Sequence, residues 1–160
     1  MRAPLEVSVG ELLRQRGLWL AVAESCTGGL IGHLLTNVPG SSDYFLGGVI
    51  AYANEAKVGL LGVRQDTLEK HGAVSQETAL EMARGVRTAM QAGIGISVTG
   101  IAGPSGGTVE KPVGTVWIGL SSNDEEYARH FQWSGNRLSV KKQSAQAALQ
   151  MLRQYLQKKV

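Results

Sequence analysis

The sequence has very little cysteine and no long hydrophobic run. Cys26 is the single cysteine among 160 residues, which excludes an intramolecular disulfide framework. No apolar stretch approaches the roughly 18 residues that a membrane span requires. Residues 1–7 lack the long apolar stretch of a secretory signal. Together these absences predict a cytoplasmic protein.

Acidic residues are missing from the carboxyl-terminal part of the chain. No Asp or Glu follows Glu126, whereas seven basic residues do: Arg129, Arg137, Lys141, Lys142, Arg153, Lys158 and Lys159. This excess could mark a site for nucleic acid or a phosphate group. It could equally be the solvated face of a terminal helix, which is the commoner case. No zinc-finger spacing, RNA-binding signature or alternation of basic and aromatic residues is present, so we do not expect nucleic acid as a partner.

What is present suffices for one packed domain over residues 1–160. Hydrophobic residues make up 43% and charged residues 18% of the chain, a balance typical of globular proteins. Apolar residues at helical spacing predict helices over 5–16, 28–37, 54–61 and 75–90, and one more after residue 133. We expect Gly17 to end the first helix, and Asn54 and Ser75 to cap the third and fourth.

Short continuous apolar runs predict strands over 18–23, 44–52, 94–99, 115–120 and 127–133. The run over 44–52 suggests a central strand. Near-continuous apolar strands that alternate with helices favour a sheet covered on both faces. We therefore predict an α/β fold, a single three-layer α/β/α domain with a mostly parallel sheet. The last two strands look like a hairpin, which makes a mixed sheet possible.

Three segments resist a purely structural interpretation, and the first is residues 24–29. A buried strand ends there and a helix begins, so the hydroxyl of Ser25 would lie at the sheet edge beside free backbone N–H groups. Such groups can hold an oxyanion or a phosphate. The alternative is a simple capping turn in which Thr27 caps the helix and Gly28 and Gly29 allow a tight bend.

The second segment is residues 52–57, where a strand ends at Tyr52 and a helix starts near Asn54. Lys57 would then lie in the first helical turn, where the helix dipole opposes a positive charge. Its pKa should be lowered there, and further if the amine is buried. A neutral amine can act as a general base for a serine. The alternative is an exposed lysine without function.

The third segment is residues 99–114, a glycine- and proline-rich loop that begins at a strand end. A loop this long in a compact domain is usually functional or disordered. Other candidates are weaker. His33, His71 and His130 lack metal-binding spacing, and Cys26 could replace Ser25 as the nucleophile but is more simply a small buried residue. Trp117 and Trp133 are expected in the core or at an interface.

At these three segments the sequence resembles a known family, the C-terminal domain of the competence- and damage-inducible protein CinA together with stand-alone nicotinamide-nucleotide amidases. The resemblance runs almost end to end and rests on residues 23–29 (AESCTGG), 38–42 (VPGSS), 48–57, 61–63, 72–75, 99–104 and 111–115. Two positions depart from the family pattern. Asn136 stands in Gly135-Asn136-Arg137 where the family commonly has an acid, and Gly93 stands where an acid often precedes the strand.

The resemblance implies hydrolysis of nicotinamide mononucleotide to nicotinic acid mononucleotide and ammonia, in pyridine nucleotide salvage. The implied catalytic residues are Ser25, Tyr52 and Lys57, and no metal or cofactor is implied. We expect the following residues to bind substrate: Thr27, Gly28, Gly29, Ser41, Ser42, Asn54, Thr99, Gly100, Gly103, Lys111 and Arg137. A homo-oligomer, most simply a dimer, and no membrane are expected. The alternative is a non-catalytic nucleotide-binding module or a partner linked to competence or DNA damage.

Overall fold

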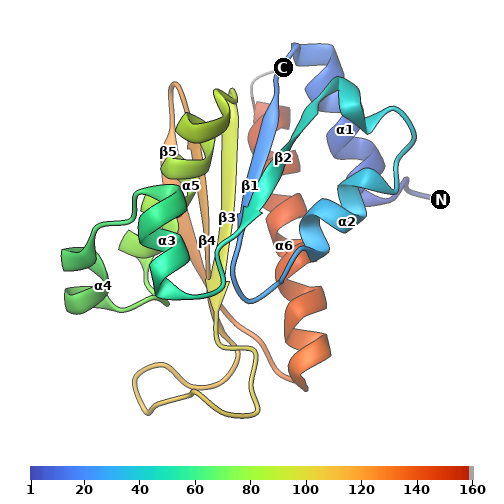
Figure 1. Cartoon of the computed structure of the whole chain (residues 1–160). Coiled ribbons are helices and arrows are strands. Elements are labelled where there is room, and N and C mark those ends of the chain that lie inside the picture. The colour runs from blue at the N-terminus through green and yellow to red at the C-terminus, as the bar shows by residue number, and fades with distance from the viewer. Residues whose placement is uncertain (159–160) are drawn as a thin grey trace.

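The computed structural model describes residues 1–158 and consists of one α/β domain (Figure 1). Lys159, one of the basic residues noted above, lies outside this range. The elements in chain order are α1 Leu5–Arg16, β1 Leu20–Glu24, α2 Leu30–Thr36, η1 Ser41–Asp43, β2 Phe45–Ile50, α3 Asn54–Leu61, α4 Gln65–His71, α5 Gln76–Met90, β3 Ile94–Gly100, β4 Thr115–Ser122, β5 Glu126–Gln132 and α6 Arg137–Lys158.

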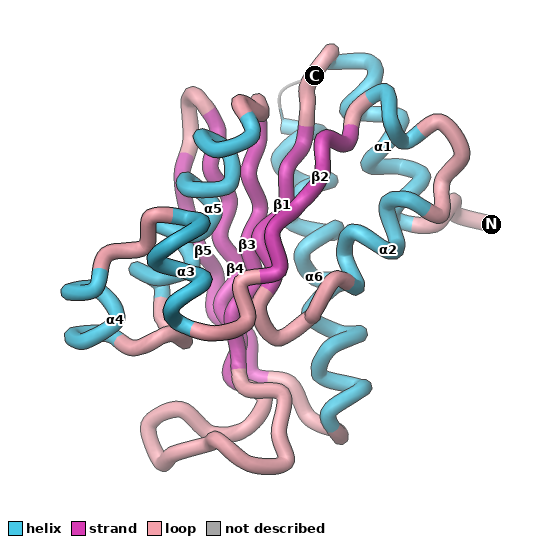
Figure 2. Tube along the Cα trace, viewed as in Figure 1, coloured by secondary structure: helices cyan, strands magenta, loops and turns pink. Residues whose placement is uncertain are grey.

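The five strands form one mixed sheet in the order β2-β1-β3-β4-β5 (Figure 2). Strand β1 pairs in parallel with β2 and with β3, so Val22 lies between Gly48 and Ile96. Strand β4 pairs antiparallel with β3 and with β5. The α/β class and the antiparallel pairing of the last two strands are therefore confirmed, with as many antiparallel as parallel pairs.

Helices cover both faces of the sheet. Figure 1 shows α1, α2 and α6 on one face and α3, α4 and α5 on the other. Two apolar clusters fill the spaces between these layers. The larger one joins β1, β3 and β4 to α1, α2 and α6, and the smaller one packs against α3, α4 and α5. Strand β1 is buried along its whole length because it lies inside the sheet with helices on both sides.

Strand β2 is an edge strand, and the expectation of a central strand was wrong. It pairs only with β1, and every second residue is exposed, with Leu46 and Ile50 at 44% and 56%. The apolar run misled because a strand with exposed apolar residues has the same composition as one buried on both faces. The carboxyl end of β2 nevertheless lies beside that of β1, where the first two candidate segments begin.

Two of the expected helix ends are confirmed. Gly17 ends α1 with φ at +61°, a backbone conformation that glycine adopts without strain. The Ser75 hydroxyl caps α5 by accepting a hydrogen bond from the Thr78 amide at 3.1 Å. Asn54 does not cap α3, because the residue at the cap position is Ala53, and its side chain offers no oxygen.

Helix α4 was not expected from the sequence. Its amino-terminal end is held by Glu81 of α5, which accepts from the Arg64 amide at 2.9 Å and from the Thr67 hydroxyl at 2.6 Å. The partner comes from another helix, so no local capping signal precedes α4. Among residues 1–158, no helix is long and apolar enough to cross a membrane.

Candidate active site

The candidate active site is a small hollow at the carboxyl edge of the sheet. It has a volume of about 160 Å³, and the segments that follow β1, β2 and β3 surround it. In Figure 1 these segments meet below the sheet, next to the amino-terminal end of α6. Seven of the expected site residues line it: Ser25, Tyr52, Asn54, Lys57, Thr99, Gly100 and Arg137. Cys26, Ala73, Val74 and Ala102 complete the lining.

Ser25 and Lys57 are in hydrogen-bond contact inside the hollow. Lys57 Nζ lies 3.1 Å from Ser25 Oγ and donates to the carbonyl oxygens of Ala51 and Tyr52, also at 3.1 Å. A neutral amine has two hydrogens and one lone pair. The two carbonyls accept the two hydrogens, which leaves the lone pair for the Ser25 hydroxyl. The site is thus arranged for a neutral lysine that accepts a proton from serine.

Burial favours this neutral form. The Lys57 side chain is 1% exposed, and no acidic group of the described chain lies within ion-pair distance of it. Removal from water penalises the charged ammonium and lowers the pKa of Lys57 below its ordinary value. The sequence had suggested the helix dipole and burial as causes, and burial is the one found here.

Cys26 has the opposite environment for a nucleophile. Burial raises the pKa of its thiol to about 12, and the charges of Lys57 and Lys141 oppose this rise only in part. The reactive species of a cysteine is the thiolate, which is scarcely populated at neutral pH under these conditions. Because its neighbour Ser25 contacts the base directly, the geometry favours the serine.

The turn after Ser25 is shaped by Glu24, a residue that the sequence analysis did not select. This buried carboxylate accepts from the Thr27 hydroxyl at 2.6 Å and from the amides of Ile31 and Gly32 at 2.9 and 3.0 Å. Glu24, and not Thr27, therefore caps α2. The available signal was an acid at the end of an otherwise apolar strand, directly before a helix start.

This capping changes which backbone N–H groups remain free. The Leu30 amide donates to the Thr27 carbonyl and the Gly28 amide to the Ser25 carbonyl, both at 3.1 Å, while Glu24 accepts from the amides of Ile31 and Gly32. Within residues 1–158, no hydrogen bond to another residue uses the amides of Cys26, Thr27 or Gly29. These three amides, and not that of Gly28, are left to stabilise negative charge next to Ser25.

Arg137 joins the long loop to the second candidate segment. Its guanidinium donates to the Gly103 carbonyl at 2.8 Å and to the Tyr52 hydroxyl oxygen at 2.7 Å. The Asn136 side chain caps α6, because its Oδ1 accepts a hydrogen bond from the backbone N–H of Ser139 at 2.9 Å. An aspartate, the acid common in the family at this position, could cap the helix in the same way. The departure from the family pattern therefore leaves Arg137 in the hollow.

Several expected substrate-binding residues lie elsewhere. Ser41 and Ser42 form η1, which precedes β2 and thus lies at the opposite edge of the sheet (Figure 1). Lys111 donates to the His71 carbonyl at 2.6 Å and ties the long loop to the end of α4. These three residues do not line the hollow. Thr99 lines it while donating to the Ala73 carbonyl at 2.8 Å.

The histidines are dispersed, as their spacing suggested. His33 contacts Asn37, His71 lies 3.7 Å from Glu77, and His130 packs against Trp117. Over the described range, no group of three or more potential metal ligands is found.

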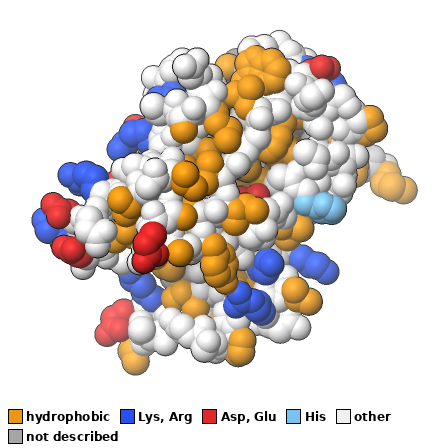
Figure 3. All heavy atoms as spheres, in the orientation of Figure 1, with side chains coloured by type: hydrophobic (Ala, Val, Ile, Leu, Met, Phe, Trp, Pro, Cys, Tyr) orange, Lys and Arg blue, Asp and Glu red, His pale blue; other side chains and the backbone are white. Residues whose placement is uncertain are grey.

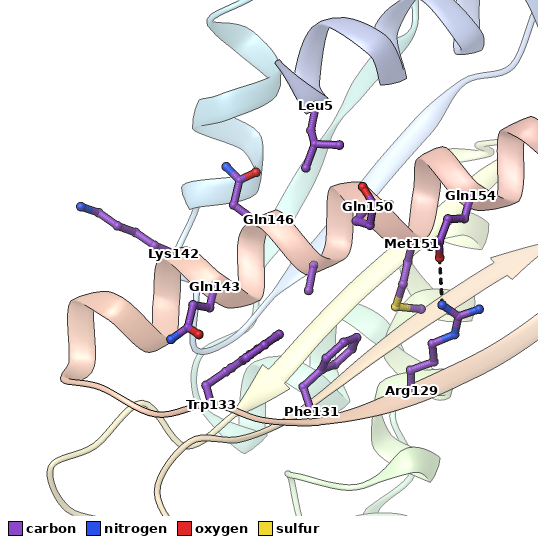
Figure 4. Close-up of a pocket in the computed structure, with 11 residues that line it drawn as sticks. Leu5, Arg129, Phe131, Trp133, Lys142, Gln143, Gln146, Gln150, Met151 and Gln154 are labelled. Carbon is purple, nitrogen blue, oxygen red and sulfur yellow. Dashed lines mark hydrogen bonds between the residues drawn. The ribbon is translucent and has the colours of Figure 1, made fainter. Parts of the chain in front are cut away.

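A second, larger cavity of about 600 Å³ lies between α6 and β5 (Figure 4). Phe131 and Trp133 stack in it with ring centroids 5.0 Å apart, and Gln146 and Gln150 line its other side. No Ser, Thr or Cys is among its lining residues. It therefore lacks the nucleophile and base that the smaller hollow contains.

The fold and the site define a one-domain α/β protein with a serine–lysine pair at the carboxyl edge of its sheet. The family model described as the CinA C-terminal domain matches residues 2–156. The chain belongs to this family.

Similar proteins agree with this assignment. The chain is 55% identical over 148 residues to a putative competence-damage inducible protein of Moorella thermoacetica, and 53% identical over 152 residues to a CinA-like protein of Salinibacter ruber. These matches cover 92% and 95% of the chain but only 36% and 37% of the relatives, so the chain spans little more than a third of their length.

Solved structures of the family share the fold. A CinA superfamily protein from Klebsiella pneumoniae has a TM-score of 0.92 at 34% identity, and 95% of each chain is covered. A competence/damage inducible protein from Agrobacterium tumefaciens has a TM-score of 0.86 at 38% identity, with 94% of this chain and 96% of that one covered.

Proposed function

We propose that this protein is an amidohydrolase that converts nicotinamide mononucleotide to nicotinic acid mononucleotide and ammonia. The observation that carries the proposal is the 3.1 Å contact between Ser25 Oγ and the buried Lys57 amine. A hydroxyl beside a neutral amine is the arrangement that activates a serine for attack on an acyl carbon. The names of the relatives refer to CinA or to competence and damage but to no reaction, so the proposal rests on the site and on the family resemblance.

In the first half of the reaction, Lys57 Nζ takes the proton of the Ser25 hydroxyl. The oxygen then attacks the carboxamide carbon, and the carbonyl electrons move onto the carboxamide oxygen. The free amides of Cys26, Thr27 and Gly29 are the donors available to that oxyanion. Removing one such donor typically costs about 3 kcal/mol of transition-state stabilisation.

The tetrahedral intermediate collapses when the carbon–nitrogen bond breaks. The departing nitrogen takes the proton that Lys57 removed from Ser25, either directly or through Tyr52, which passes on its own proton and receives that of the Lys57 ammonium. The Tyr52 oxygen accepts from Arg137 at 2.7 Å, so its own O–H remains free to donate toward the hollow. Ammonia leaves and a Ser25 ester remains. Water, deprotonated by Lys57, then attacks the ester and releases the carboxylic acid.

The size of the hollow suits one end of a nucleotide. Typical sites that enclose whole small molecules measure about 300–1,000 Å³, whereas this one measures about 160 Å³. The carboxamide ring would occupy it, and the ribose and phosphate would extend outside. Tyr52 at the rim is 58% exposed, and Arg137 beside it carries N–H groups beyond the two already used. A substrate with an anionic group remote from the carboxamide fits this layout.

The direct test is an ammonia-release assay on nicotinamide mononucleotide with the purified chain. We expect stoichiometric ammonia and nicotinic acid mononucleotide, resolved by chromatography. Nicotinamide riboside and free nicotinamide serve as comparison substrates and should react more slowly. A protein that binds the mononucleotide without releasing ammonia would contradict the enzymatic function.

The names of several relatives favour one alternative, a binding module linked to competence or DNA damage. Such a module would bind nucleotide or DNA without hydrolysis. Contacts with phosphates release counterions, so DNA binding would weaken steeply with salt. A titration with random duplex DNA at two salt concentrations tests this alternative, and we expect no salt-dependent binding.

A further inference from the structure

Lys141 is a basic residue beside the candidate site to which no role has been given. It follows Arg137 by four residues on α6, so the two side chains share one face of the helix. Arg137 lines the hollow. The Lys141 ammonium lies 3.7 Å from the position that a Cβ atom on Gly28 would occupy. Lys141 therefore covers the turn that carries the nucleophile.

The fold offers Lys141 no structural partner. Its side chain is partly buried, yet it forms no hydrogen bond or ion pair with any residue in the range 1–158. The first turn of α6 contains no acid, and the helix dipole disfavours cations at this end. Figure 3 shows basic side chains gathered near the lower end of α6, with no acidic side chain among them in that view. Stability alone does not explain a second cation here, but an anionic ligand would.

Lys57, which contacts Ser25, and Lys141, which lies beside the turn at Gly28, come from helices on opposite faces of the sheet. Lys57 belongs to α3 and Lys141 to α6, and these helices cover opposite faces of the sheet (Figure 1). A substrate that reacts at Ser25 next to Lys57 can thus extend across the sheet edge toward α6. In nicotinamide mononucleotide the ribose separates the carboxamide from the phosphate, so the phosphate must be held at a distance from the base.

We propose that Lys141, acting with Arg137, forms an anion subsite for the phosphate monoester of the substrate. Arg137 has N–H groups left after its bonds to Gly103 and Tyr52, and these can share the phosphate oxygens with the Lys141 ammonium. The inference rests on the proposed function for the identity of the substrate. The subsite itself requires only a phosphate group near the turn after Ser25.

The test compares Lys141→Met, Lys141→Arg and a control, Lys142→Met. Lys142 has the same charge and is the next residue, but it is exposed and lies beside the cavity between α6 and β5 (Figure 4). The measured quantity is the ratio of kcat/KM for the mononucleotide to that for the riboside. We expect Lys141→Met to lower this ratio about 10- to 100-fold, the range of one charge-assisted hydrogen bond. Lys141→Arg should restore most of it, and Lys142→Met should leave it as in the wild type.

A binding measurement separates this inference from the proposed function. Calorimetric titration of nicotinamide mononucleotide and of inorganic phosphate into Ser25→Ala requires no turnover. If the double variant Ser25→Ala, Lys141→Met binds both the mononucleotide and inorganic phosphate more weakly than Ser25→Ala does, the subsite is supported even if the wild type releases no ammonia. The anion subsite would be overturned if Lys141→Met left both the kcat/KM ratio and the calorimetric affinities unchanged. It would also be overturned if Lys142→Met lowered them as much as Lys141→Met does. Circular dichroism of each variant verifies the fold.

Discussion

The side chains of Ser25 and Cys26, adjacent in the chain, meet different surroundings. Ser25 contacts the Lys57 amine, whereas burial raises the pKa of the Cys26 thiol to about 12. Cysteine is intrinsically the better nucleophile, but only as a thiolate. Contact with a base therefore outweighs intrinsic reactivity at this turn.

We expect Ser25→Ala to lower kcat for ammonia release at least about 1,000-fold, because a nucleophile that is lost is not replaced by the remaining groups. Cys26→Ala should retain most of the activity, since the thiol takes no part in the proton transfers. Steady-state assays on both variants measure this. An inactive Cys26→Ala together with an active Ser25→Ala would show that the cysteine is the nucleophile.

The activity should depend on pH through Lys57. Burial lowers the pKa of Lys57, and the base is competent only when neutral. Activity is therefore low at acidic pH and rises as pH passes the folded-state pKa, which lies below the roughly 10.4 of a free lysine. Folding stability should also rise with pH between the folded and unfolded pKa values, because the unfolded chain binds the proton more tightly there.

Lys57→Met should lose about 100- to 10,000-fold in kcat/KM, the usual range for a general base. Lys70→Met on α4 is the matched control, because Lys70 is exposed and lies outside the hollow. The measurement is a pH–rate profile for each variant. Full activity of Lys57→Met with the wild-type profile would rule out the general-base role.

At the scale of elements, the turn between β1 and α2 depends on one buried carboxylate. Glu24 accepts three hydrogen bonds, two from the buried Thr27 hydroxyl and Ile31 amide and one from the partly buried Gly32 amide. These bonds hold the start of α2 and leave the preceding amides free beside Ser25. The same residue thus holds the start of α2 in the turn that carries Ser25.

We expect Glu24→Ala to lower the free energy of unfolding by about 2–5 kcal/mol, because two buried donors and one partly buried donor lose their acceptor. In a chain of this size that corresponds to a fall in Tm on the order of 10 °C. Glu24→Gln should cost less, since its amide oxygen can still accept. Glu11→Ala, on the exposed face of α1, is the control. Tm is measured by scanning calorimetry, and equal Tm values for Glu24→Ala and Glu11→Ala would contradict the capping role.

At the scale of the whole molecule, the residues that line the candidate site come from elements far apart in the chain. Ser25 follows β1, Lys57 lies on α3, and Arg137 begins α6. Parallel pairing of β1 with β2 and β3 brings the ends of these strands to one sheet edge, where active sites of α/β proteins are usually found. The expected homo-oligomer stays a prediction, which light scattering of the purified chain can measure.

The proposed reaction uses only groups of this site and water. Accordingly, dialysis against a chelator should leave kcat and KM unchanged, and added divalent metal should not raise them. The assay is repeated before and after dialysis, with metal content measured in the same samples. A loss of activity that metal restores would show that the mechanism lacks a component.

The sequence by itself determined the family, the fold class and the positions of Ser25, Tyr52 and Lys57 within it. Local signals sufficed there, because apolar periodicity and end residues such as Gly17 and Ser75 act over a few residues. Tertiary structure alone decided that β2 is an edge strand and that Ser41 and Ser42 lie away from the hollow. It also decided that Glu24 and Glu81 cap helices and that Lys141 reaches the turn at Gly28. Burial and contacts between distant segments arise only when the chain packs, so no short stretch of sequence could predict them.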